Sequence, residues 1–343
     1  MGLKTTISIA APELKVNSGT KTYVENVFKG LDTAGVNYNK IMVKKHEISI
    51  KGKPFFGFLS QYANALFKSA NTSVVHALSP DSVIKGTNLV TVHDIIPLVR
   101  KDIYFRSFYD KLAFSKSIQR LLRIDNLLLS TEIGKTEVME NLNVDEERIR
   151  VLHLSIDHGV FFPSSVNPYL DNGKIKVLMV SDFNPRKRID LAIKALRDDD
   201  EIDFYHIGPD NLWERKKSEA VEISKGANNI HILGAVGRDK LRDYISYADL
   251  FVYLTEAEGF GFPPIEAMAC GTNVLVSDLS VFHETLRDKA SFVNNKDFTT
   301  EDIKKALSAR LDPHKLVEYS RSYSIEKYAS GLLDIYKSIG RNI

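Results

Sequence analysis

A chain of 343 residues, 43% of them hydrophobic and 26% charged, indicates a globular protein of about two domains at ~150 residues each. Its formal net charge of +2 is too balanced for a dedicated nucleic-acid-binding protein. The single cysteine, Cys270, excludes an intramolecular disulfide framework, and no apolar run approaches the ~18 residues of a membrane-spanning helix, so we expect a cytoplasmic protein.

The first half of the chain alternates between predicted strands and predicted helices. Apolar, β-prone runs indicate the strands, and helical patterns lie between most of them. This alternation predicts a parallel sheet with helices on both faces, whose ligands bind beyond the carboxyl ends of the strands. The predicted strands cover residues 5–10, 38–43, 73–78, 88–94 and 126–131.

Two positions in this half lie at predicted strand ends. Gly19, in the loop NSGTK, would let a phosphate approach the backbone closely, although a plain loop explains this glycine equally well. His93 and Asp94 end a predicted strand, where a histidine contacts ligand if it faces the site and is structural otherwise. Asp94 would orient His93 or cap a turn.

Residues 100–123 combine basic and aromatic side chains in a predicted helix. One interpretation is a solvated face over a core, and the other is a surface that contacts anionic lipid at the inner membrane surface. The loop KGKPFFGF at residues 51–58 is a second segment of this kind. The basic residues of the predicted helix include Arg106, Lys111, Lys116, Arg120 and Arg123.

The second half repeats the alternation after a segment rich in proline and glycine. That segment predicts an interdomain linker at 161–173, between an N-terminal domain at 1–160 and a C-terminal domain at 174–322. The last residues, 323–343, predict an amphipathic helix that packs back towards the N-terminal domain. Further strands are predicted at 176–181, 202–208, 230–234, 250–255 and 272–277.

The stretch EGFGFPPIEAMACG, residues 258–271, places two carboxylates around a Gly/Pro turn that begins a helix. Pro263 and Pro264 suit a first helical turn, and a helix N-terminus offers N–H groups and a positive dipole end to a phosphate. Glu258 and Glu266 are suited to accept hydrogen bonds from the hydroxyls of a sugar and a ribose. The pattern therefore predicts a site for a sugar that is joined to a nucleotide through phosphates.

Two charged runs complete the candidate sites. Arg186 and Lys187, in the run RKR after the strand at 176–181, would neutralise a diphosphate, unless they are ordinary surface charge. The acidic run at 198–200 superficially fits a divalent metal site, but it lies at the amino end of a predicted strand, so we expect a solvated turn. The nine histidines show no paired zinc spacing, and we expect no metal.

These segments together resemble the family 4 glycosyltransferases. The resemblance rests on EGFGFPPIEAMACGTNVLVSD, ADLFVYLT, VLMVSDFNPRKRIDLAI, TVHD and RVLHLSIDHGVFFP, and it is strongest over residues 176–295. It implies an α/β chain of GT-B architecture, in which two Rossmann-like domains with parallel sheets face a central cleft. It also implies a retaining transfer of a hexose from a UDP- or GDP-linked sugar, without a metal or a permanently bound cofactor.

The resemblance also implies a role for each candidate residue. Glu258 would accept hydrogen bonds from the donor sugar, Glu266 would hold the ribose, and Lys187 would stabilise the departing diphosphate. His93 would lie near the transferred sugar, which makes Glu258, Lys187 and His93 the catalytic set. The rest of the donor site would comprise Gly19, Arg186, Gly259, Phe260, Gly261 and Phe262.

One departure from the family pattern concerns the cations. Family members carry Gly-Arg where this chain has Ser181 and Asp182, and we expect Arg186 to replace the missing arginine. The expected partners are a nucleotide sugar and a glycan or lipid-linked acceptor bound by the N-terminal domain. The alternatives are a non-catalytic nucleotide-sugar-binding module and a phosphorylase or epimerase with the same two-domain design.

Overall fold

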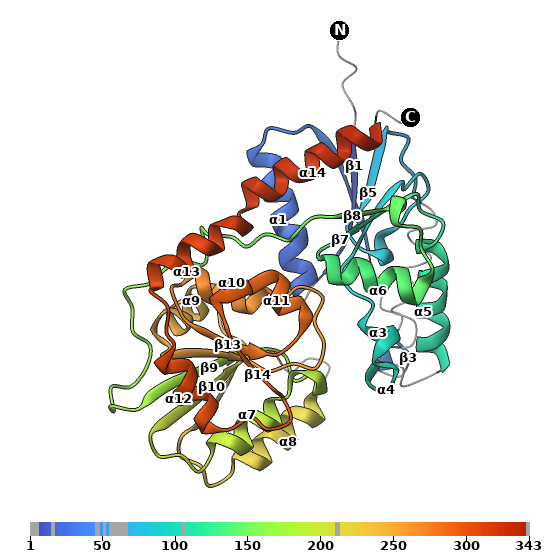
Figure 1. The fold of residues 1–343 in the computed structure, drawn as a ribbon. Coiled ribbons are helices and arrows are strands. Elements are labelled where there is room, and N and C mark those ends of the chain that lie inside the picture. Colours follow the sequence, from blue (N-terminus) through green and yellow to red (C-terminus); the bar gives the residue numbers. More distant parts are fainter. Residues whose placement is uncertain are drawn as a thin grey trace. The chain divides into compact units, whose positions relative to one another are not determined.

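The predicted α/β architecture is confirmed: the chain forms two parallel sheets with flanking helices (Figure 1). Contacts divide the chain into a first unit, Met1–Ser155 with Ile325–Ile343, and a second unit, Ile156–Ser324. The structure is a computed structural model, and it describes residues 7–14, 18–44, 49–50, 53–54, 68–104, 108–209 and 213–340.

The first sheet has six parallel strands in the order β2-β1-β5-β6-β7-β8. They are β1 (Ile7–Pro12), β2 (Tyr38–Val43), β5 (Val74–Ala77), β6 (Leu89–Val92), β7 (Asn126–Leu129) and β8 (Ile149–Val151). The helices of this part are α1 (Gly19–Thr33), α3 (Ile96–Val99), α4 (Lys101–Tyr104), α5 (Phe108–Leu121) and α6 (Glu132–Leu142). A separate antiparallel pair is formed by β3 (Ser49–Ile50) and β4 (Lys53–Pro54).

The basic and aromatic segment predicted as one helix contains two, α4 and α5, with residues 105–107 outside the described residues. Arg106 therefore lies outside them, as does most of the loop at 51–58. Contact of these segments with a membrane stays a prediction.

The C-terminal helix α14 (Ile325–Gly340) completes the first unit. It contacts α1, where a Cβ on Gly30 would lie 3.0 Å from Cβ of Ala329. Two buried hydrogen bonds fix α14 further: the Tyr336 hydroxyl bonds Nδ1 of His76 at 2.8 Å, and the Tyr328 hydroxyl bonds that of Tyr23 at 3.0 Å. The helix is thus part of the first core, although the whole second unit precedes it in the chain.

The segment at 161–173, predicted as a linker, lies inside the second unit. Ser164 donates a hydrogen bond to Asp243 at 2.6 Å, and the Tyr169 hydroxyl donates to the carbonyl of Tyr244 at 2.7 Å. The proline and glycine content reflects an irregular segment packed on α9 (Arg238–Tyr247). The chain passes between the units at residues 155–156 and 324–325 instead.

The second sheet also has six parallel strands, in the order β11-β10-β9-β12-β13-β14. Numbered along this half of the chain, the order is 3-2-1-4-5-6, and its direction reverses between β9 and β12. The strands are β9 (Ile175–Val180), β10 (Ile202–Ile207), β11 (Ile230–Gly234), β12 (Leu250–Tyr253), β13 (Val274–Ser277) and β14 (Ser291–Val293). Such a reversal leaves a crevice at the carboxyl ends of the two central strands, where doubly wound sheets bind ligands.

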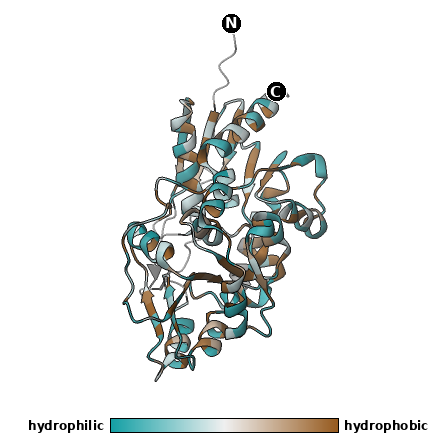
Figure 2. Ribbon diagram, turned by 60° about the vertical axis from the view of Figure 1, so that its left-hand side comes forward, coloured by the Kyte–Doolittle hydropathy of each residue, from teal (hydrophilic) through white to brown (hydrophobic). Residues whose placement is uncertain are grey.

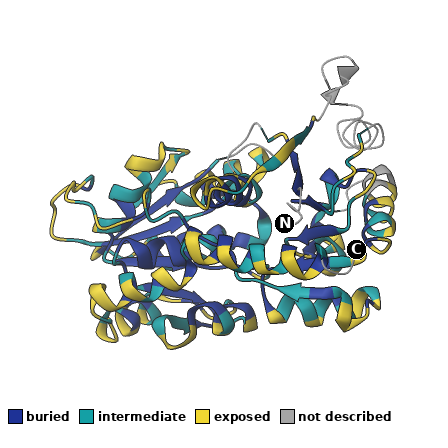
Figure 3. Cartoon of the chain, turned by 90° about the horizontal axis from the view of Figure 1, so that it is seen from above, coloured by how far each residue is buried: buried dark blue, intermediate teal, exposed yellow. Residues whose placement is uncertain are grey.

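Helices cover both faces of the second sheet (Figure 1). The strands are rich in Val, Ile and Leu and read as continuous apolar runs because both faces are buried. Figure 2 shows hydrophobic residues along the strands, and Figure 3 shows the same strands as buried. Besides α9, the helices are α7 (Ile189–Leu196), α8 (Glu214–Ser224), α10 (Phe262–Ala269), α11 (Ser280–Leu286), α12 (Thr300–Ser308) and α13 (Pro313–Ser320).

Gly208, directly after β10, determines how closely the loop that follows β9 can approach. A Cβ at this position would lie 1.7 Å from the carbonyl oxygen of Ser181. Only glycine allows this approach, because backbone atoms cannot move aside as a flexible side chain can. The loop after β9 therefore starts close against the carboxyl end of β10.

Candidate functional site

The loops that follow β9 and β12 meet at the crevice position of the second sheet. After β9, a 3₁₀ turn at Pro185–Lys187 is capped by Asn184, whose side-chain oxygen accepts from the Arg186 amide at 3.2 Å. After β12, the amide of Glu256 donates to the carbonyl of Arg186 at 2.8 Å. A main-chain hydrogen bond thus joins the two loops at the switch point.

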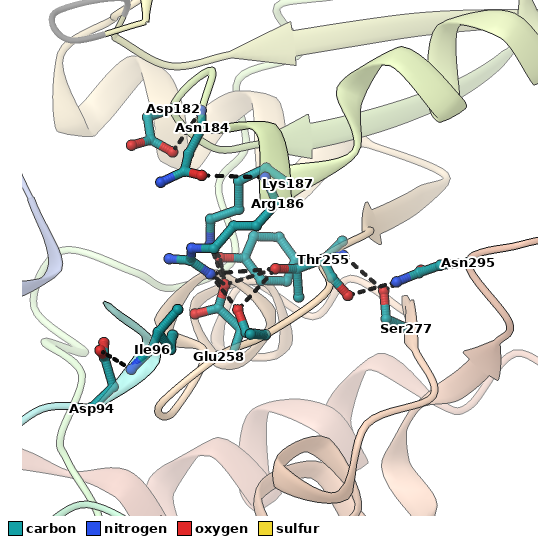
Figure 4. Close-up of polar contacts among 12 residues, drawn as sticks. Asp94, Ile96, Asp182, Asn184, Arg186, Lys187, Thr255, Glu258, Ser277 and Asn295 are labelled. Carbon is teal, nitrogen blue, oxygen red and sulfur yellow. Dashed lines mark hydrogen bonds and ion pairs between the residues drawn. The ribbon is translucent and has the colours of Figure 1, made fainter. Parts of the chain in front are cut away.

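The Glu258 carboxylate lies between the two predicted cations (Figure 4). Its Oε1 atom accepts from Nη1 of Arg186 at 2.5 Å and from Nζ of Lys187. The hydroxyls of Tyr253 and Thr255 donate to the same oxygen, each at 3.2 Å. The three charged side chains are only 7–13% exposed, so the structure brings Arg186, Lys187 and Glu258 together in a buried cluster.

The charges of this cluster determine its protonation. Burial alone would raise the pKa of Glu258, but Arg186 and Lys187 outweigh burial and bring that pKa to about 2. Burial lowers the pKa of Lys187, and the charge of Glu258 opposes this shift. Two cations thus face one carboxylate, with Asp182 as a weaker negative neighbour of Lys187. This arrangement suits an anionic ligand.

Glu266 has the opposite environment, although it belongs to the same stretch of sequence. It lies on α10, is 8% exposed, and burial raises its pKa to about 7, with the charge of Arg238 opposing the rise. Within the described part of the chain, its carboxylate receives no hydrogen bond. A buried acceptor of this kind is unfavourable for folding and is suited to a ligand that brings hydroxyl donors.

Gly261 shapes the turn between these two carboxylates. It caps α10 in the left-handed region, with φ of 89°, and the two prolines follow in the first turn, as predicted from their spacing. A Cβ on Gly261 would lie 2.5 Å from Cε1 of Phe282, a fully buried ring on α11. Both the backbone conformation and the space therefore require glycine here.

The first unit carries the two remaining predicted residues. Gly19 is the first residue of α1, exposed, and follows Ser18, whose hydroxyl accepts from the Lys21 amide at 3.2 Å. His93 follows β6, and its Nε2 bonds the carbonyl of Leu78 at 3.1 Å. Because a carbonyl only accepts, Nε2 carries the proton and Nδ1 is the acceptor. Burial lowers the pKa of His93 to about 4, so the ring is neutral at physiological pH.

The acidic run 198–200 lies in the turn between α7 and β10, at the amino edge of the sheet and away from the crevice. The Asp198 side chain is 87% exposed and pairs with Arg197 at 3.5 Å. Within the ranges that the structure describes, no group of three His, Cys, Asp or Glu side chains could hold a metal ion.

Four residues near the cluster were not predicted as site residues: Tyr253, Thr255, Ser277 and Asn295. The first three end strands that the sequence did predict, and carboxyl ends of parallel strands share one edge of a sheet, so their positions alone could have identified them. Asn295 follows β14, which has three residues and was not predicted. No sequence signal placed it at the site.

Comparison with known proteins agrees with this geometry. Residues 164–323 match a family described as "Glycosyl transferases group 1". This range covers almost the whole second unit, including the cluster and Glu266. This range, slightly less than half of the chain, is therefore similar to the group 1 glycosyl transferases.

The relatives of this chain include proteins described as mannosyltransferases. The chain is 28% identical over 233 residues to the O-antigen chain mannosyltransferase RfbU of Salmonella typhimurium, a match that covers 68% of this chain and 64% of RfbU. It is 25% identical over 291 residues to the serotype-specific mannosyltransferase WbdA of Escherichia coli, which covers 78% of this chain and 34% of WbdA. The match thus spans less than two thirds of either relative.

Solved structures extend the likeness to both units. Sucrose-phosphate synthase from Thermosynechococcus elongatus superposes with a TM-score of 0.77 over 98% of this chain and all of that one, at 18% sequence identity. The two six-stranded sheets with their helices are those of the GT-B fold, which confirms the predicted fold class. Among the helices that the structure describes, none is long and apolar enough to cross a membrane.

The raised pKa of Glu266 predicts how stability depends on pH. Between pH 4.5 and 7 the folded protein keeps a proton on Glu266 that the unfolded chain has lost, so the free energy of unfolding falls as pH rises. Glu266→Gln should abolish this fall in the free energy of unfolding. The variant should therefore be more stable than wild type at pH 8, by up to about 3 kcal/mol. At pH 4 the two should be equally stable in urea denaturation.

The exposed Glu318 of α13 offers the matched control, Glu318→Gln. It should follow the wild-type curve at both pH values. An equal stability difference at pH 4 and pH 8 for Glu266→Gln would contradict the assignment.

The turn at Gly261 leads to a second prediction, which concerns the free energy of unfolding. Gly261→Ala should lower the free energy of unfolding by about 2–5 kcal/mol, the sum of left-handed strain and overpacking against Phe282. Gly234→Ala is the control, since Gly234 has φ of 72° but nothing within 4 Å of the added Cβ. It should cost only about 1–2 kcal/mol. Equal losses in the two variants would show that the contact with Phe282 has no effect.

Proposed function

We propose that this protein is a glycosyltransferase that moves a hexose from a nucleoside-diphosphate sugar to a glycan, lipid-linked or small-molecule acceptor. The observation that carries this proposal is the buried cluster of Arg186, Lys187 and Glu258 at the switch point of a domain similar to the group 1 glycosyl transferases. Its excess of positive charge fits the diphosphate of such a donor.

The donor would bind along the loops after β9 and β12. Glu266 would accept the ribose hydroxyls, which would supply hydrogen-bond donors to a carboxylate that receives none from the described residues. Arg186 and Lys187 would bind the diphosphate, with Arg186 in place of the arginine that the family carries at position 182. Backbone N–H groups in the turn 259–262, beside the positive end of α10, would hold the distal phosphate or the sugar.

Glu258 would contact the donor sugar through its second oxygen. The four donors that this carboxylate has among the described residues all converge on Oε1, which leaves Oε2 to accept a sugar hydroxyl. A carboxylate paired with two cations is a weak nucleophile, because its negative charge is already compensated. We therefore favour a role in orienting the donor over a covalent glycosyl-enzyme.

Stabilisation of the leaving group would be the main catalytic contribution. Negative charge builds on the diphosphate as its bond to the sugar breaks, and Lys187 and Arg186 lie ready to oppose it. In a retaining transfer on one face of the sugar, the departing phosphate oxygen takes the proton of the acceptor hydroxyl. The new glycosidic bond then forms as the old bond breaks, and neither a separate base nor a metal ion is required.

The first unit would supply the acceptor side. His93, neutral and with Nδ1 as an acceptor, would bind a hydroxyl of the transferred sugar, and Gly19 would allow a phosphate close to the backbone. The names of the two relatives favour mannose as the sugar and a polysaccharide as the acceptor. GDP-linked mannose is therefore the first donor to test, followed by UDP-linked hexoses.

The proposal predicts that nucleoside diphosphate is released only when both a nucleotide sugar and an acceptor are present. Lys187→Ala and Glu266→Ala should each reduce transfer more than tenfold, given ~2–4 kcal/mol for electrostatic contacts of this kind. The folded state is checked by circular dichroism and by retained thermal unfolding. Lys194→Ala, at a 59% exposed lysine of α7, is the matched control and should transfer at the wild-type rate.

Other outcomes would favour other functions. Binding of nucleotide sugar without turnover would indicate a binding module, and conversion of the donor without an acceptor would indicate an epimerase or a hydrolase. Loss of transfer in EDTA, with recovery on addition of a divalent ion, would contradict metal independence.

A further inference from the structure

A closed ring of three hydrogen bonds lies beside the charged cluster of the second unit (Figure 4). The Thr255 amide donates to the Ser277 hydroxyl at 2.7 Å, that hydroxyl donates to Oδ1 of Asn295 at 2.5 Å, and Nδ2 of Asn295 donates to the Thr255 carbonyl at 2.6 Å. Thr255 and Ser277 are fully buried. The ring joins the carboxyl ends of β12, β13 and β14.

Only one assignment of donors and acceptors is consistent with the three hydrogen bonds of the ring. The Ser277 hydroxyl has one proton, which it gives to Asn295, so it accepts from Thr255. Oδ1 of Asn295 must then face Ser277, and its amide nitrogen must face the carbonyl of Thr255. Two side chains thus bind both main-chain polar groups of a single residue.

The side chain of Thr255 contacts the charged cluster, whereas its main chain belongs to the ring. Its hydroxyl shares its proton between the carbonyl of Ala257 at 3.0 Å and Glu258 at 3.2 Å. Arg186 donates to that hydroxyl at 3.3 Å and to the same Ala257 carbonyl. A shift of the Thr255 backbone would therefore move Glu258 relative to both cations. Errors of about 1 Å in such positions can reduce rates about a hundredfold.

We propose that Ser277 and Asn295 are positioning residues for the glycosyl transfer proposed above, on which this inference rests. They touch no part of the charged cluster in the described structure, and act by holding the backbone of Thr255. Their hydrogen bonds lie at the carboxyl edge of the sheet, where the charged cluster is. A role in stability alone would be served equally well by such bonds at the amino edge.

The amino edge of the same sheet offers a matched control. Asn229 is buried, and its Nδ2 donates to the carbonyls of Leu196, Asp199 and Ile202 at 2.8–2.9 Å. It thus performs the same kind of loop bonding as Asn295, at the edge opposite the cluster. Asn229→Ala should lower stability and leave the kcat of transfer unchanged.

The test compares Asn295→Ala, Asn295→Asp and Ser277→Ala with Asn229→Ala in the full chain, each assayed well below its own unfolding temperature. We expect the first three to lower kcat about 10- to 100-fold. The KM of the donor and the Kd of the nucleoside diphosphate, from calorimetry, should stay within about threefold. The groups proposed to hold the diphosphate and the ribose, Arg186, Lys187 and Glu266, belong to the loop after β9 and to α10, outside the ring. Asn295→Asp keeps the volume and the acceptor but loses the donor to Thr255, so it should match Asn295→Ala.

Three outcomes would overturn the positioning role. In the first, Asn295→Ala transfers at the wild-type rate. In the second, kcat falls equally in Asn295→Ala and Asn229→Ala, in proportion to lost stability. In the third, Asn295→Asp behaves as wild type, which would show that only volume matters. A wild-type protein without transfer from any donor would instead overturn the proposed function, and the positioning role with it.

Discussion

The buried carboxylate of Glu258 is the interaction on which the rest of the second unit depends. A charge removed from water is tolerated only when it is paired and hydrogen-bonded, and Oε1 of this carboxylate receives four donors. The two cations follow β9, whereas Glu258 follows β12. The ion pairs therefore reinforce the main-chain hydrogen bond that joins the two loops at the switch point.

Glu258 and Glu266 show how environment separates two identical side chains. Glu258 has a pKa of about 2 because two cations outweigh its burial, and Glu266 has a pKa of about 7 because burial disfavours its charged form. The first stabilises the folded protein at neutral pH, and the second destabilises it. A buried group that opposes folding is retained where a ligand can satisfy it, which is the physical basis for placing a ribose at Glu266.

The sequence predicted those features that depend on local pattern. The strands of both sheets, except the two edge strands β8 and β14, follow from apolar runs, and the turn at 261–264 follows from glycine and proline chemistry. The unit boundary did not follow, because a proline-rich segment can pack as well as link. Asn295 could not be predicted either, since its role depends on a three-residue edge strand with no distinctive pattern.

Two successive caps in the loop after β9 set the position of Arg186. The Asp182 side chain accepts from the Asn184 amide at 3.4 Å (Figure 4). The Asn184 side chain in turn accepts from the Arg186 amide at 3.2 Å. These two caps tighten the loop into the 3₁₀ turn that directs Arg186 towards Glu258. Asp182 thereby helps to place the guanidinium beside Glu258, although it is itself an anion close to the cluster.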